Sequence, residues 1–403
     1  MKIYYINRCL TQYHSSPGMW GRQVLFGLRR SGAAVSSYPA IGGPACATGS
    51  PRVRAQGRPE GVGRYRSLLM SHYSRRWMAW LLEAWMMGRG AANTIAGSLW
   101  ALWHRRRIET DIVLGRQAEY EATSQLVALV LGRPLVLEVH SIHFIERQMR
   151  GRRASRLLRA FECWQWRRAA RIWVNSAALK SIIVEHGISA NTVRVISFGV
   201  DLERFVPHGH ADTGSKVEIR VVFVGSFYAW HGAEVLLRAF AAAHKQARGL
   251  RLIMVGDGAR RAPSEALARE FGIAEAVEFT GWVSNDQVIE RLGRVDIGVA
   301  PYLGIEPFYF DPAKIIEYMA AGLATLASNQ GRIAEMVEDD VSGILLPPGD
   351  EAALTAALLR LANDKALRER LGEAARQRAE TMFSWPEISR QVLALCAEAA
   401  RGG

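Results

Sequence analysis

The segment whose residues could most clearly do chemistry is FDPAKIIEYMAAGLATLAS, residues 310–328. Asp311 and Pro312 are typical of a helix start, so the N–H groups of the next turn and the positive end of the helix dipole would form an anion site that suits a diphosphate. Lys314 lies in that turn and adds a mobile cation. Glu317, nearly one turn further, could accept two hydroxyls of a ribose through its two carboxylate oxygens.

These residues need a scaffold, and the C-terminal half alternates strand-like and helix-like segments. Between the strand-like runs lie amphipathic stretches with apolar residues at i, i+3, i+4 and i+7. This alternation predicts a parallel sheet covered on both faces. The expected strands fall at 220–225, 251–256, 276–281, 296–301, 324–328 and 343–347. The N-terminal half repeats the pattern less regularly, in KIYYIN, DIVLG, PLVLEVH, RIWVNS and VRVIS.

A polar, glycine-containing joint, PHGHADTGSKVE, separates the two halves. We expect an N-terminal Rossmann-like domain over 1–205, a second one over 206–385, and a final helix over 386–403 that could cross back to the first domain. The fold class is therefore α/β, with two doubly wound parallel sheets facing across a cleft. Ligands of open α/β sheets bind at the carboxyl ends of the strands, which would line that cleft.

Charge is unevenly distributed along the 403 residues. The whole chain has 51 Lys and Arg against 38 Asp and Glu, but residues 1–110 hold 16 basic and only 3 acidic side chains. The remainder carries 35 of each sign, so its net charge is zero. An anionic partner attracted at long range would therefore meet the first quarter of the chain.

Residues 67–107 do not fit the alternation of strands and helices. Arginines, Leu and Met surround five tryptophans there, and Gly88 and Gly90 predict a helical hairpin. Tryptophan and arginine beside apolar residues are typical of a helix lying in the plane of an anionic membrane surface. The alternative is a pair of inserted helices that pack their aromatic face on the core. The five tryptophans are Trp77, Trp80, Trp85, Trp100 and Trp103.

Several classes of protein are disfavoured by the sequence. The four cysteines are widely spaced with no CxxC pair, which indicates neither a zinc site nor a disulfide framework and fits a reducing cytosol. We identify no signal peptide and no apolar run long enough to span a membrane. Asp339 and Asp340 could form a metal pair, but a surface turn is the preferred interpretation.

The ordered set of motifs resembles the retaining GT-B glycosyltransferases of glycosyltransferase family 4. In that family a helix of the form PxKxxEYMAxGxPV binds the nucleotide-sugar donor, and residues 312–325 are similar to it. Further agreement comes from VNSAALKSIIVEHGISANTVRVISFGVDLERFVP, VGSFYAWHGAEVLLRAF, LIMVGDG and VEFTGWVSNDQV. The resemblance covers nearly the whole chain and is strongest from about residue 171.

The resemblance implies roles for the residues around the donor. Glu317 would hold the donor ribose, and Lys314 with the amides after Asp311 would contact phosphate. Gly225 would open the phosphate loop of the donor domain, and Trp282 with Val283 would lie in the loop that binds the base.

The resemblance also implies roles for two N-terminal positions. His140, at the end of PLVLEVH, would lie near the sugar and the reacting centre, so we expect it to be catalytic together with Lys314 and Glu317. Gly18 matches a glycine loop that faces donor phosphate and acceptor. For His143 a core or capping role is the preferred interpretation.

The sequence departs from the family pattern in two places. Ser226 and His231 stand where the family has an Arg and a Lys, so the cations around the phosphates are weaker, and His231 would help only when protonated. Tyr309 stands where a second glutamate is usual, and Glu306 is out of register. A tyrosine can exchange one hydrogen bond with a sugar hydroxyl, so we expect altered donor choice rather than lost activity.

The resemblance implies a hexosyltransferase-type enzyme that moves a sugar from a nucleotide-diphosphate donor to a glycan or lipid-linked acceptor, with no metal and no cofactor. We expect a cytoplasmic protein, peripheral on the inner face of the plasma membrane through 67–107, acting in polysaccharide or glycolipid synthesis. An epimerase or hydrolase on the same scaffold is one alternative. A catalytically degenerate membrane scaffold is another, whereas no recognised motif supports nucleic-acid binding.

Overall fold

The computed structural model describes residues 1–7, 16–38, 76–149, 155–206 and 218–402, and the side chains of 16–20 and 76–82 lie outside that description. The chain forms two compact units, and each contains one six-stranded sheet. The first unit comprises Met1–Val174, Ile182–Arg194 and Ser389–Gly403, and the second comprises Asn175–Ser181 and Val195–Ile388. Helix α15 (Trp385–Arg401) therefore begins in the second unit and ends in the first.

The sheet of the first unit has the strand order β2-β1-β3-β4-β5-β6. Its strands are β1 (Lys2–Ile6), β2 (Ala34–Tyr38), β3 (Ile112–Arg116), β4 (Leu135–Val139), β5 (Arg171–Val174) and β6 (Val193–Val195). The pairings from β2 through β1, β3 and β4 to β5 are all parallel, which confirms the predicted sheet type. Strand β2 was not predicted, because AVSSY is polar at two of its five positions and buries alternate residues at the sheet edge.

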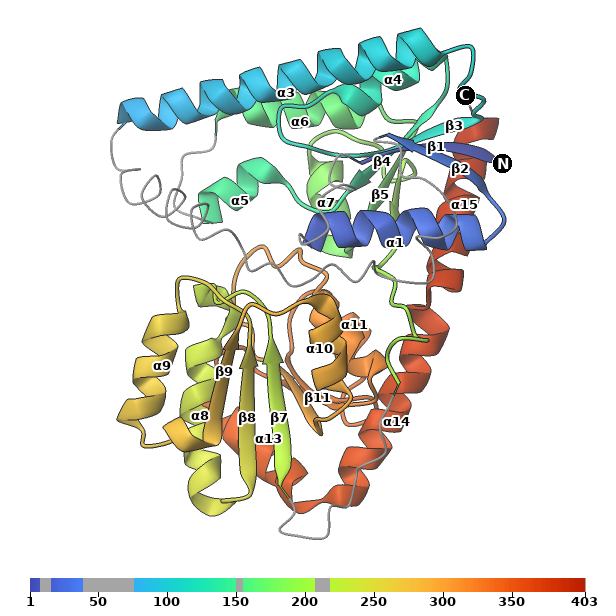
Figure 1. Cartoon of the computed structure of the whole chain (residues 1–403). Helices are drawn as coiled ribbons and strands as arrows, with labels where there is room; N and C mark the ends of the chain where they lie inside the picture. The colour runs from blue at the N-terminus through green and yellow to red at the C-terminus, as the bar shows by residue number, and fades with distance from the viewer. Residues whose placement is uncertain (8–15, 39–75, 150–154, 207–217, 403) are drawn as a thin grey trace. The chain divides into compact units, whose positions relative to one another are not determined.

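The helices of this unit are α1 (Ser16–Arg30), α3 (Arg76–His104), α4 (Thr123–Leu131), α5 (His143–Met149) and α6 (Arg156–Arg167). Helix α7 (Ala177–Glu185) begins in the second unit and ends in the first. Helix α3 lies along α4 (Figure 1), and Ala101 of α3 packs with Tyr4 and Val113 of the sheet. Both helices therefore cover one face of the sheet.

The predicted hairpin at Gly88 and Gly90 is wrong, because α3 continues through both glycines for 29 residues. The second glycine allows close packing instead of a turn. A Cβ atom at Gly90 would lie 2.1 Å from the carbonyl oxygen of Tyr120, and one at Gly97 would lie 2.5 Å from Cγ2 of Thr123. The backbone of α3 can thus approach the start of α4 only without side chains at these positions.

The sheet of the second unit has the strand order β12-β11-β10-β7-β8-β9, and its pairings are parallel. All six strands lie within about two residues of the predicted runs. They are β7 (Ile219–Val224), β8 (Leu250–Val255), β9 (Val277–Gly281), β10 (Ile297–Ala300), β11 (Ala324–Ser328) and β12 (Ile344–Leu346).

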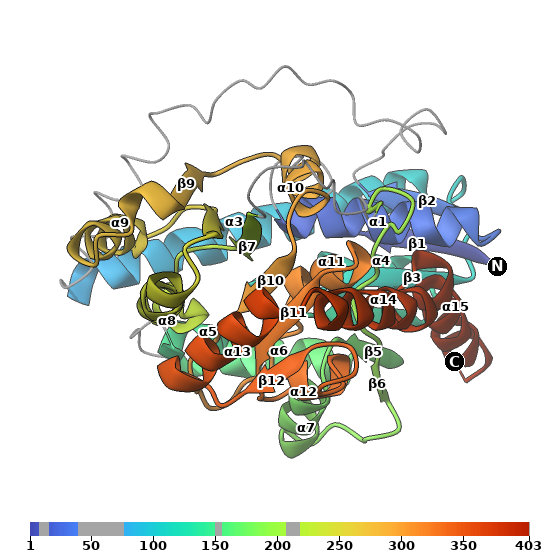
Figure 2. The same cartoon turned by 90° about the horizontal axis from the view of Figure 1, so that it is seen from below.

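Alternate residues of β7 face two different cores, as the period of a strand requires. Val221 and Phe223 pack with α8 and α13, whereas Val222 packs with α11 and α14. Figure 2 shows these two helix pairs on opposite sides of the sheet. The helices are α8 (Ala233–Gln246), α9 (Arg261–Glu270), α10 (Asn285–Leu292), α11 (Ala313–Ala320), α12 (Ile333–Met336), α13 (Glu351–Asn363) and α14 (Lys365–Met382).

Candidate functional site

The start of α11 is held by the carboxylate of Asp311. One oxygen of Asp311 accepts hydrogen bonds from the Ser197 hydroxyl at 2.7 Å and from the Phe198 N–H at 3.0 Å, and Nε of Arg332 lies 3.9 Å from the other oxygen. Burial raises the pKa of Asp311 to about 6 against these opposing contacts. The N-cap residue, Pro312, supplies no capping side chain. Its carbonyl accepts from the Ile315 N–H at 2.9 Å, and the amides of Ala313 and Lys314 have no hydrogen-bond partner among the described residues.

The amine of Lys314 is buried beside aromatic rings. Lys314 is 8% exposed, and its Nζ lies 4.5 Å from the ring centre of Phe223 and 4.9 Å from that of Tyr302. Among the described residues Nζ has no hydrogen-bond partner. Burial lowers the pKa of Lys314 to about 7, although the nearby Glu317 favours the charged form. A buried amine with this environment would be stabilised by an anion.

The loop after β7 brings Gly225 and His231 to the same place. Gly225 has a φ of +152°, and a Cβ atom built on it would lie 2.7 Å from Nζ of Lys314 and 3.5 Å from Nδ1 of His231. The structure therefore gathers three of the predicted donor-binding residues. Ser226 lies next to Gly225 in this loop with an exposed side chain.

His231 is neutral in this arrangement. Its Nδ1 lies 2.5 Å from the carbonyl oxygen of Ser226, and a carbonyl can only accept, so Nδ1 carries the proton. Burial and the positive charge of Lys314 lower the pKa of His231 to about 3. The unprotonated Nε2 then remains as an acceptor, and the positive charge of this cluster resides on Lys314.

Glu317 lies three residues after Lys314 on α11 and is half-buried. Burial raises its pKa to about 7, against the opposing effect of Lys314 and Arg204. Trp282 and Val283 follow β9, so they lie at the same carboxyl edge of the parallel sheet as Gly225 after β7. Trp282 is 50% exposed, so part of its side chain is accessible to solvent.

Tyr309 lies in the core rather than on an open surface. Its side chain is fully buried, its ring centre is 4.6 Å from that of Phe310, and its carbonyl accepts a hydrogen bond from the Ser176 hydroxyl at 2.7 Å. The Tyr309 side chain therefore contributes to the packed core next to the start of α11. A contact between its hydroxyl and a sugar stays a prediction.

In the first unit, His140 follows β4 and contacts a buried carboxylate. Its Nε2 lies 3.1 Å from Glu138, whose side chain is fully buried and whose other oxygen accepts a hydrogen bond from the Tyr5 hydroxyl at 3.0 Å. The guanidinium of Arg116 lies 3.6 Å from the same carboxylate. Burial and Arg116 hold the pKa of His140 well below its usual range. Gly18 lies in the first turn of α1.

Sequence reasoning missed Glu138 and Arg116 as partners of His140. The available signal was a glutamate inside the apolar strand PLVLEVH, because a buried carboxylate requires paired donors. It also missed that Asp311 ties the segment after β6 to α11. Asp339 and Asp340 instead serve a turn: Asp339 accepts from the N–H of Leu345 at 2.8 Å and Asp340 pairs with Arg360 at 2.8 Å.

The described tryptophans of helix α3 lie in two environments, and the side chains of Trp77 and Trp80 lie outside the described residues. Trp100 packs against Tyr4 and Tyr38 with ring centres 6.1 and 5.2 Å apart, which agrees with core packing. Trp85 and Trp103 are 58% and 87% exposed. No helix in the described ranges combines the length and apolar character needed to cross a bilayer.

Two family models match most of the chain. "Glycosyltransferase Family 4" matches residues 84–204 and "Glycosyl transferases group 1" matches residues 218–364. Among curated relatives, the MMP alpha-(1->4)-mannosyltransferase of Mycolicibacterium hassiacum is 28% identical over 78% of this chain and 77% of its own length. The alpha-maltose-1-phosphate synthase of Mycobacterium tuberculosis is 33% identical over 55% of this chain, which spans 61% of that relative.

Solved structures share the fold over the whole chain. The sucrose-phosphate synthase of Thermosynechococcus elongatus superposes with a TM-score of 0.71 at 20% identity, covering 100% of both chains. HepE of Anabaena, solved with UDP and glucose, has a TM-score of 0.63 at 19% identity and covers 99% of this chain and 100% of its own.

Proposed function

This chain belongs to the GT-B glycosyltransferases, and we propose that it moves a sugar from a nucleotide-diphosphate sugar to a glycan or lipid-linked acceptor with retention at the anomeric carbon. We further propose that it acts in the cytoplasm, at the inner face of the plasma membrane, in polysaccharide or glycolipid synthesis. The observation that carries the proposal is the amine of Lys314, which has no hydrogen-bond partner among the described residues and lies beside Gly225 at a helix start without a capping side chain.

The donor diphosphate would bind between the loop after β7 and the first turn of α11. Lys314 and the amides after Asp311 would neutralise the charge that grows on the leaving phosphate as the sugar becomes oxocarbenium-like. A bound diphosphate would raise the pKa of both Lys314 and His231. These groups would supply the required positive charge without a metal or another cofactor. HepE, which shares the fold, was solved with UDP.

The rest of the donor would follow the same sheet edge. The Glu317 carboxylate would accept the two ribose hydroxyls, and Trp282 with Val283 would contact the base. Ser226 and Tyr309, which replace charged residues of the family pattern, would alter which donor is preferred. From the first unit, His140 would contact the transferred sugar near the reacting carbon, and Gly18 would lie close to the phosphates.

We propose that α3 holds the enzyme on anionic lipid. From 84 to 103 the exposed side chains of this helix are apolar except Arg89. Arg105, Arg106 and Arg107 are exposed directly after it. An apolar helix face flanked by arginines matches the chemistry of an anionic bilayer surface, where apolar side chains enter the acyl boundary and guanidinium groups meet headgroups.

The test is a transfer assay with UDP-, GDP- and ADP-sugars and membrane extracts as the source of acceptor. We expect acceptor-dependent transfer in which the anomeric configuration of the donor is kept. Release of nucleotide that is independent of acceptor would instead favour a hydrolase or an epimerase. Absence of any nucleotide binding would favour a degenerate scaffold.

A further inference from the structure

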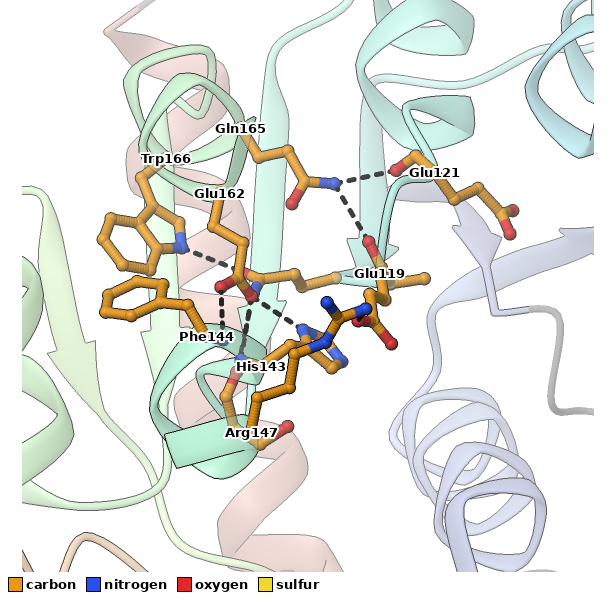
Figure 3. Close-up of polar contacts among 11 residues, drawn as sticks. Glu119, Glu121, His143, Phe144, Arg147, Glu162, Gln165 and Trp166 are labelled. Atoms are coloured by element: carbon orange, nitrogen blue, oxygen red, sulfur yellow. Dashed lines mark hydrogen bonds and ion pairs between the residues drawn. The ribbon is translucent and has the colours of Figure 1, made fainter. Parts of the chain in front are cut away.

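A second buried carboxylate in the first unit, Glu162 of α6, binds the start of α5. One oxygen accepts from the His143 N–H at 3.1 Å, from Nδ1–H of His143 at 2.7 Å and from the Gln117 amide at 2.5 Å. The other oxygen accepts from the Phe144 N–H at 3.1 Å. Figure 3 shows Glu162 directed at the first residues of α5. Four N–H donors thus converge on a carboxylate that is fully buried.

This network fixes the orientation and tautomer of His143. Since the carboxylate can only accept, Nδ1 carries the proton and Nε2 is the ring's outer nitrogen. The side chain is 22% exposed, and among the described residues the ring's one hydrogen bond is that of Nδ1 to Glu162. Gln117 is held in turn, because its oxygen accepts from the Trp166 indole N–H at 2.7 Å. The imidazole is therefore held rigidly while one of its polar atoms remains unused.

The position of His143 is at the ligand-binding edge of its sheet. It lies after β4, three residues beyond His140, and Gln117 follows the neighbouring strand β3. Carboxyl ends of adjacent parallel strands are where open α/β sheets bind ligands. Apart from Gly18, the groups proposed for the nucleotide belong to the second unit, so a polar side chain at this edge of the first unit is available to the other substrate.

Charge around His143 indicates what kind of ligand group fits. Glu162, Glu119 and Glu146 all raise the pKa of His143 against the effect of burial. Arg147, on the next turn of α5, is paired with Glu119 at 2.5 Å and with Glu83 at 3.3 Å. Carboxylates therefore outnumber cations in this cluster, which disfavours an anionic ligand and favours an uncharged hydroxyl.

We propose that His143 binds a sugar hydroxyl of the acceptor through Nε2, and that Glu162 is the residue that positions it. The inference rests on the proposed function in so far as it names the acceptor. His143 would then be a second substrate-binding imidazole of the first unit, in addition to His140. The group bound by His143 would be a sugar hydroxyl and not a phosphate.

Two substitutions of His143 distinguish the role of Nδ1 from that of Nε2. His143→Asn keeps an N–H that can donate to Glu162 but removes Nε2, whereas His143→Gln places an amide near the position of Nε2. We expect His143→Asn to raise the KM for acceptor about tenfold with nucleotide affinity and melting temperature unchanged, the loss of one hydrogen bond to the ligand. His143→Gln should restore part of the affinity. His186→Asn is the control, since Nδ1 of His186 bonds the Ile182 carbonyl in the same unit.

A direct binding test does not depend on transfer. Ring signals of ¹³C-labelled histidine are followed while methyl glucoside, methyl mannoside or inorganic phosphate is added to the full chain. The signal of His143 is identified by its loss in His143→Asn. We expect at least one sugar to shift this signal, no shift with phosphate, and a lower titration midpoint for the signal in Glu162→Gln.

The outcomes separate this inference from the proposed function. A shift with phosphate alone, or with neither ligand, would overturn the binding role of His143. So would an unchanged acceptor KM in His143→Asn, or a loss of activity that only follows a loss of stability. If sugar shifts the His143 signal but the intact enzyme transfers nothing, the proposed function fails and the sugar site stands.

Discussion

A Cβ atom at Gly225 would lie 2.7 Å from Nζ of Lys314. Gly225 directly follows the strand β7, whereas Lys314 belongs to the first turn of α11, so the loop and the helix meet where only a hydrogen atom fits between them. A phosphate placed here could reach the amine of Lys314 and the amides of Ala313 and Lys314 at the start of α11, whereas the Gly225 N–H already donates to the Val255 carbonyl at 2.9 Å. This closeness makes the pair the most sensitive point of the proposed donor site.

Substitution of Gly225 tests that closeness. In Gly225→Ala the methyl group displaces Nζ of Lys314, and the positive φ costs roughly 1 to 2 kcal/mol of stability. We expect nucleotide affinity, measured by calorimetry, to fall at least about tenfold. Gly272→Ala is the control, since Gly272 has a φ of +67° with no heavy atom within 4 Å of its Cβ position. Equal losses of affinity in both variants would contradict the account.

Lys314 should make the ligand-free protein less stable near neutral pH. Its pKa is lowered from 10.5 to about 7 on folding, so between those values the unfolded chain holds a proton that the folded one lacks, and stability rises with pH. Below about pH 7 the full penalty is present. Lys314→Met should therefore raise the free energy of unfolding at pH 7 by at least about 1 kcal/mol. Denaturant titrations should find this gain shrinking toward pH 10.5, and a pH-independent difference would count against a buried amine.

His140 should affect chemistry more than nucleotide binding. It lies in the first unit beside Glu138, whereas Lys314 and Glu317 lie in the second. We expect His140→Ala to lower kcat about a hundredfold, in the range of a lost acid–base or sugar contact. Nucleotide affinity should change less than about threefold. The same substitution at His186 should leave kcat unchanged. Comparable losses of kcat in both variants would point to a general structural effect.

Membrane contact through α3 is tested with its exposed residues. Wild-type protein should sediment with vesicles containing phosphatidylserine, and binding should weaken at high salt because charge contributes to it. Trp85→Ser/Leu99→Ser/Trp103→Ser should largely abolish sedimentation. A variant with Leu129→Ser, Leu157→Ser and Phe271→Ser is the control, because Leu129 and Leu157 are exposed on other helices and Phe271 is exposed directly after α9. Equal recovery of both variants in the pellet would exclude α3 as the contact.

Much of the fold follows from local pattern. Buried parallel strands read as apolar runs, so RVVFVG and PLVLEVH were recognisable without a structure. The hydrophobic pattern of the sequence does not predict structure correctly where an element packs against residues that are distant in sequence. Gly90 resembles a helix breaker in sequence, and only the position of Tyr120 explains why glycine is needed within α3. Likewise β2 is an edge strand with few apolar positions, and its partner β1 supplies the pairing.

The same limit applies to the candidate site. Lys314 and Glu317 share one helix, so their spacing alone places them together. Asp311 belongs to that motif, yet its carboxylate binds Ser197 and Phe198, more than 110 residues away in sequence. Pairings of this kind, and the burial that shifts the pKa of His231, depend on tertiary contacts. No spacing rule in the sequence encodes them.

The most direct test of the central claim is calorimetric titration of the full chain with UDP, GDP and ADP. We predict that at least one nucleotide binds wild type, that Glu317→Ala and Lys314→Ala each weaken it at least about tenfold, and that Glu270→Gln and Lys245→Ala, on exposed helix surfaces, do not. No binding of any of the three nucleotides by wild type, or equal affinity in all four variants, would contradict a donor site at Lys314 and Glu317.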